Sequence, residues 1–75
     1  MMSAIARKRA EAEYWRLQGR LHLQLAVGAA DPALIQLYGD LARGARDLAL
    51  AIDKEAGRWE EAAKASREWA ARRGS

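Results

Sequence analysis

The stretch GAADP, residues 28–32, carries the clearest signals in this sequence for a break between regular elements. Gly28 accepts the left-handed backbone conformation that is common at helix C-caps. Asp31 is a favourable N-cap residue, and Pro32 suits the first position of a helix. The stretch therefore predicts that one helix ends near residue 27, a turn covers residues 28–31, and a second helix begins at residue 32.

The residues before the turn predict a helix over about residues 3–27. Ser3 is a possible N-cap, and the segment is rich in helix-forming Ala, Leu, Gln and Arg. Gly19 weakens this helix by about 1 kcal/mol relative to Ala. The segment LHLQLAV, residues 21–27, alternates apolar and polar side chains as a strand would. We nevertheless expect it to be helical, because the chain offers no second strand to pair with it.

An apolar stripe runs through the residues after Pro32, at intervals of four and three that are typical of a packed helix. Its members are Leu34, Tyr38, Leu41, Ala45, Leu48, Ile52, Glu55 or Ala56, Trp59, Ala62, Ser66 and Trp69. The stripe keeps its phase across Gly57, which predicts one long helix over about residues 32–72. A break at Gly57, giving a three-helix bundle, is the alternative.

These elements predict an all-α fold, an antiparallel two-helix hairpin with a long second helix, in a single domain over residues 1–75. A short turn places successive helices side by side and antiparallel. We expect a stripe of Tyr14, Leu17 and Leu21 to face the second helix. The same pairing brings the basic cluster Arg7, Lys8 and Arg9 beside the acidic residues Asp47, Asp53 and Glu55.

The composition predicts self-association. The chain is 51% hydrophobic, but eighteen of those residues are Ala, and there is no Cys to form a disulfide. A chain of 75 residues buries only a modest core, so a core this poor in large side chains needs additional stabilisation. We expect a homodimer or a higher helical bundle.

Charge and hydropathy indicate the cellular location and the classes of partner that we expect for the protein. The net charge is +3, which is modest for a dedicated nucleic-acid-binding protein. No uninterrupted apolar run approaches the about 20 residues that a membrane span needs. We therefore expect a cytoplasmic protein with no membrane partner.

No motif in the sequence predicts a catalytic, cofactor or metal site. His22 is the only histidine, and the residues three and four positions away are Gln18, Gly19, Leu25 and Ala26, none of which is a usual metal ligand on a helix. Gly-rich phosphate-binding loops are also absent. We expect a protein that is not an enzyme and needs no cofactor.

The function predicted is a small protein–protein interaction module of the adaptor, small-chaperone or inhibitor type. Trp15, Leu23 and Val27 lie off the stripe expected to face the second helix, which predicts that they mediate self-association. The partner-binding residues predicted on the C-terminal part of the second helix are Arg58, Trp59 and Trp69, because aromatic and Arg side chains dominate binding hot spots. The alternative is a small dimeric nucleic-acid-binding regulator that contacts phosphates through Arg7, Lys8, Arg9, Arg72 and Arg73.

Overall fold

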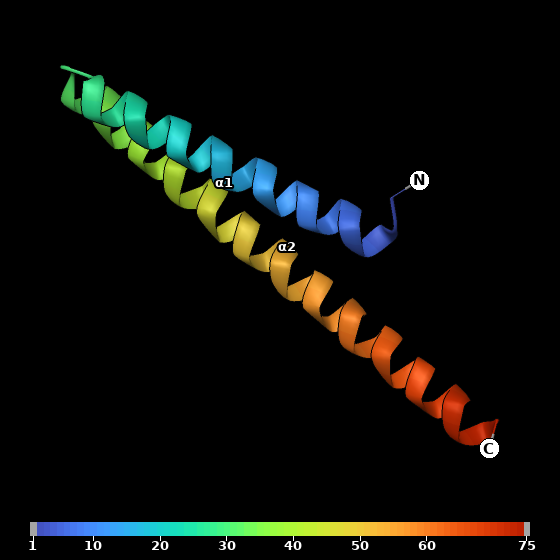
Figure 1. Ribbon diagram of the computed structural model, residues 1–75. Helices are drawn as coiled ribbons and strands as arrows, with labels where there is room; N and C mark the ends of the chain where they lie inside the picture. The colour runs from blue at the N-terminus through green and yellow to red at the C-terminus, as the bar shows by residue number, and fades with distance from the viewer. Residues whose placement is uncertain (1, 75) are drawn as a thin grey trace.

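The computed structural model describes residues 2–74, which form two α-helices joined by a short turn (Figure 1). Helix α1 spans Ala4–Gly28, and helix α2 spans Pro32–Arg73. No strand occurs within the described residues, which confirms the all-α fold class. Helix α2 passes through Gly57 without interruption, so the three-helix alternative is wrong.

Side-chain caps mark where both helices begin. Ser3 Oγ accepts a hydrogen bond from the Ala6 N–H at 3.1 Å, and Asp31 Oδ1 accepts one from the Ala33 N–H at 2.9 Å. Each bond satisfies a backbone donor that has no partner within its own helix. Pro32 occupies the first turn of α2, where its missing N–H removes no helical hydrogen bond.

The turn differs from the predicted one at Gly28. No glycine in residues 2–74 has a positive φ angle, so the expected left-handed cap at Gly28 is wrong. The chain leaves α1 at Ala29, whose backbone is extended (φ −79°, ψ 141°). Its N–H donates to the Ala26 carbonyl at 3.3 Å, which closes the last turn of α1 without a left-handed residue.

Helix α1 lies along the first part of α2, and the two helices run in opposite directions (Figure 1). Gly19 in the middle of α1 lies against Ala42, and Arg9 near the start of α1 reaches Asp53. Helix α2 then continues well past the start of α1. The molecule measures 66 × 21 × 11 Å, and its length comes from the 42 residues of α2 at about 1.5 Å per residue.

The contact between the helices is built from small side chains. Gly19 lies at a point of close approach, where an added Cβ would be 3.4 Å from the Ala42 carbonyl oxygen and 3.7 Å from the Ala45 Cβ. The buried residues are Ala12 and Ala26 in α1, and Ala42, Ala45, Ala49, Ile52 and Ala56 in α2. Those of α2 recur at intervals of three and four, as one side of a packed helix requires.

The predicted stripe of α1 does not face α2. Tyr14, Leu17 and Leu21 are each about half exposed, whereas Ala12 is completely buried. The predicted stripe of α2 is correct in part: Ala45, Ile52 and Ala56 are buried, whereas Leu41 and Leu48 are exposed. The physical reason is the short distance between the backbones: Ala and Gly allow the helices to approach closely, and Leu at these positions would hold them apart.

Neither described helix contains a stretch both apolar and long enough to cross a lipid bilayer.

We predict that Gly19→Ala stabilises the fold, although Gly19 lies in the contact. The new methyl group would sit at ordinary van der Waals distance from α2. Because Ala favours the helix by about 1 kcal/mol relative to Gly, the free energy of unfolding, measured by urea denaturation, should rise by about that amount.

Gly57→Ala is the matched control, because a Cβ at Gly57 meets nothing within 4 Å and reports the propensity gain alone. Gly19→Leu should instead lower the free energy of unfolding by about 1–3 kcal/mol through overpacking, while Gly57→Leu should not. Equal tolerance of Leu at both positions would contradict the close helix contact.

Candidate functional site

The candidate functional site consists of helix surfaces. Among residues 2–74 there is no group of three or more His, Cys, Asp or Glu side chains placed to hold a metal ion. The same residues include no buried polar side chain that lacks a hydrogen-bond partner. Exposed charged and apolar side chains cover α1, α2 and the part of α2 beyond α1.

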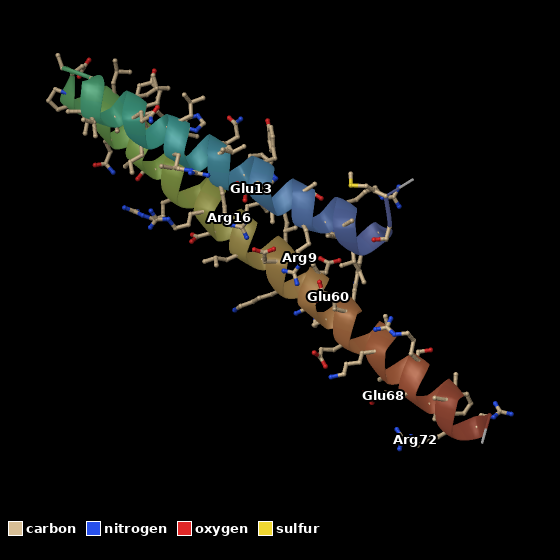
Figure 2. All side chains as sticks on the ribbon, in the orientation of Figure 1. Arg9, Glu13, Arg16, Glu60, Glu68 and Arg72 are labelled. Carbon is tan, nitrogen blue, oxygen red and sulfur yellow. The ribbon has the colours of Figure 1, made fainter. Side chains whose placement is uncertain are left out.

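One side of the helix pair carries a network of ion pairs, which we call the ion-paired face and which comprises Arg9, Glu13, Arg16, Asp53 and Glu60 (Figure 2). Arg9 donates to Asp53 at 3.1 Å and to Glu60 at 2.8 Å. Arg16 donates to Glu13 at 2.7 Å and also pairs with Asp53. Asp53 thus accepts hydrogen bonds from two arginines that lie about two turns apart on α1, and this pairing fixes the register of the two helices.

The sequence predicted part of this pairing. Lys8 pairs with Glu55 at 3.6 Å and Arg9 pairs with Asp53, as expected for the basic cluster. Lys8 Nζ also lies 5.3 Å from the centre of the Trp59 ring. The roles of Arg16 and Glu60 were missed, although Arg9 and Arg16 are seven residues apart in the sequence, as are Asp53 and Glu60. That spacing puts each pair on one side of its helix and could have identified the network.

The other side of the helix pair is apolar. We define this apolar face by Tyr14, Leu21 and Leu25 of α1 and Leu34, Leu41 and Leu48 of α2, which are 41–53% exposed. A groove between the helices on this side is lined by Trp15, His22, Asp40, Leu41, Gly44, Ala45 and Leu48. Asp40 is the one charged residue among these, and its Oδ1 accepts a hydrogen bond from Gln36 Nε2 at 3.0 Å.

Aromatic rings lie along the apolar groove. Tyr14 and Trp15 make an edge-to-face contact with ring centres 5.1 Å apart, and the rings of His22 and Tyr38 lie 6.4 Å apart. His22 Nδ1 lies 2.7 Å from the Gln18 carbonyl oxygen, to which it donates in the tautomer that protonates Nδ1. His22 therefore has a structural hydrogen bond within α1, and its ring belongs to the apolar groove.

A second groove lies on the side of the ion-paired face. It is lined by Arg16, Gly19, Arg20, Leu23, Ala42, Arg46, Ala49 and Leu50. Leu23 is 48% exposed and Val27 is 83% exposed. The three residues predicted to mediate self-association thus do not form one surface, because Trp15 lines the apolar groove and Leu23 lines this basic one.

The predicted partner-binding residues Arg58, Trp59 and Trp69 lie on α2, and Trp69 is the one of the three in the part beyond α1. We call residues 61–73 the C-terminal extension. Trp69 in this extension is 57% exposed, and the Arg73 guanidinium lies 4.7 Å from the centre of its ring. Arg58 is exposed and is eleven residues, or about three turns, before Trp69, so the two lie on nearly the same line along α2. Trp59 lies beside Ala4, Arg7 and Lys8 at the start of α1.

Comparison with known proteins gave no relative: no protein-family model, curated protein or solved structure matches this chain.

We predict that Asp53→Asn weakens the helix pairing by about 1 kcal/mol, because it removes the carboxylate shared by Arg9 and Arg16 at a partly exposed site. The free energy of unfolding should fall more in low salt than in high salt, since salt screens the pairs that are lost. Asp47→Asn, an exposed position on the same helix, is the control. An equal loss in both variants would contradict a specific role for Asp53.

Proposed function

We propose that the protein is a non-enzymatic protein–protein interaction module. In this proposal a two-helix hairpin self-associates into a dimer or a higher helical bundle and binds a protein partner through the C-terminal part of α2, which carries Arg58, Trp59 and Trp69. The observation that carries the proposal is the location of the large apolar side chains, most of which, unlike Ile52, lie outside the contact between α1 and α2. No large side chain among the described residues is fully buried.

The exposed area supports self-association. The chain exposes 5828 Å², whereas a folded monomer of its mass, 8.3 kDa, is expected to expose about 4,600 Å². The excess is larger than the about 800 Å² that each partner buries in a standard protein–protein interface. A core of alanines also contributes little, because burying one methyl group is worth only about 0.8 kcal/mol. A second molecule would supply the burial that one chain lacks.

The side chains of the C-terminal extension support a binding role for it. An exposed Trp on a helix with no neighbouring helix is a typical anchor residue for a partner. The Arg73 guanidinium lies over the Trp69 ring, so an aromatic ring and a guanidinium group are adjacent, and Arg58 lies on the same line of α2 about 16 Å away. This combination suits a partner surface with an apolar pocket and neighbouring carboxylates.

The alternative, a nucleic-acid-binding regulator, is less supported by the side-chain contacts. Lys8 and Arg9 are paired with carboxylates of α2, and Arg73 lies over Trp69. Phosphate binding would have to compete with these contacts. We expect any binding to mixed-sequence DNA or RNA at physiological salt to be weaker than a Kd of about 10⁻⁴ M, measured by fluorescence anisotropy. Micromolar binding would reverse the order of the two proposals.

The protein-binding proposal is tested with the tagged full-length chain used as bait in extract from its source cells. A partner recovered by the wild type should bind Trp69→Ala about thirtyfold more weakly, because a hot-spot Trp contributes about 2 kcal/mol or more. Arg67→Ala is the matched control, since Arg67 lies two residues away and about 200° around the helix. Recovery of the same proteins by wild type and Trp69→Ala at equal yield would contradict the proposal.

A further inference from the structure

The two sides of the helix pair differ in charge, and this difference points to the side that a second copy covers. Residues two apart on an α-helix are rotated by about 200°. Leu21 and Leu23 therefore lie on different sides of α1, and Leu48 and Leu50 on different sides of α2. This assignment agrees with the two grooves, since Leu48 lines the apolar one and Leu23 and Leu50 line the basic one.

None of the six residues that define the apolar face is charged. Asp40, at the edge of the groove on this side, accepts a hydrogen bond from Gln36 and lies 3.8 Å from the Arg43 guanidinium. The basic groove instead carries Arg16, Arg20 and Arg46. Arg16 is paired with Glu13 and Asp53, and Arg20 lies 3.5 Å from Glu13. Two copies that met through the basic groove would have to remove these ion pairs and the Arg46 guanidinium from water, and that desolvation opposes the contact. Two copies that met through the apolar face would bury leucines and aromatic rings, with Asp40 as the one charged side chain that lines the groove.

The apolar face also carries the kind of side chains that line the interface of a helical bundle. Its six defining side chains are each about half exposed and come from both helices. Two such faces together offer four leucine-bearing helix surfaces, which is the arrangement of side chains in a four-helix bundle core. The area that one chain leaves exposed in excess of a folded monomer exceeds one partner's share of a standard interface.

We propose that two copies pack their apolar faces together to form a four-helix bundle. Tyr14, Leu21, Leu25, Leu34, Leu41 and Leu48 become its core, together with Trp15 and His22 in the groove. The ion-paired face, the arginines of the basic groove and both C-terminal extensions remain outside. This inference rests on the proposed self-association and adds to it the surface that the copies share.

Two matched pairs of variants test the proposal by sedimentation over a range of protein concentrations. Leu21→Glu and Leu48→Glu place a charge in the bundle core and should raise the dimer Kd about a hundredfold or more, equal to about 2.7 kcal/mol. Leu23→Glu and Leu50→Glu make the same chemical change on the opposite side, and they should leave the dimer Kd within about threefold of the wild type.

The outcomes separate this inference from the function on which it rests. A wild-type chain that stays monomeric at every concentration overturns both self-association and the shared face. A wild-type dimer that Leu23→Glu or Leu50→Glu disrupts, while Leu21→Glu and Leu48→Glu do not, overturns the apolar face alone and supports the surface predicted from the sequence.

A labelling experiment keeps the test decisive if a Glu variant fails to fold. The chain has no Cys, so Leu21→Cys and Leu23→Cys each introduce the only thiol. Maleimide labelling of the Leu21→Cys thiol should slow as protein concentration rises through the dimer Kd, while labelling of the Leu23→Cys thiol should not. Concentration-independent labelling of both thiols in a dimeric sample would overturn the proposed interface.

Discussion

The close approach of α1 and α2 at Gly19 is the constraint on which the rest of the structure depends. Helices in such close contact accept only small side chains between them, and the buried row is accordingly almost entirely alanine. The leucines and aromatic residues are then displaced to the outside of the pair. The contact that brings the helices together thus creates the exposed apolar face, and the same close approach lets short ion pairs such as Arg9–Glu60 span from one helix to the other.

Local signals in the sequence predicted the two helices well. The Asp31 cap, Pro32 and the unbroken phase across Gly57 act within a few residues, and they gave the turn and the continuous α2. The choice of contact face was wrong because two stripes with the same spacing lie side by side on α1. Hydrophobicity alone favours the stripe of Tyr14, Leu17 and Leu21, whereas the distance between backbones selects the row that includes Ala12 and Gly19.

The candidate surfaces were predictable to a similar degree. The pairing of Lys8 and Arg9 with Glu55 and Asp53 followed from folding the chain about its turn, because opposite charges met at the expected register. The prediction that Trp15, Leu23 and Val27 mediate self-association assumed that the leucine stripe of α1 was buried against α2. Because that stripe is exposed, the helix contact runs between Trp15 and Leu23, and these two residues line different grooves.

Because α2 is unbroken, the number of residues between the helix pair and Trp69 sets the direction of the Trp69 side chain relative to the pair. Trp69 is joined to the paired part of α2 by helix alone, without a hinge residue that interrupts it. Inserting one residue between Trp59 and Trp69 would turn Trp69 by about 100° and move it about 1.5 Å along the axis. Inserting seven, about two turns, would nearly restore its direction at a greater distance. The number of residues between Trp59 and Trp69 therefore sets the direction in which the Trp69 side chain points.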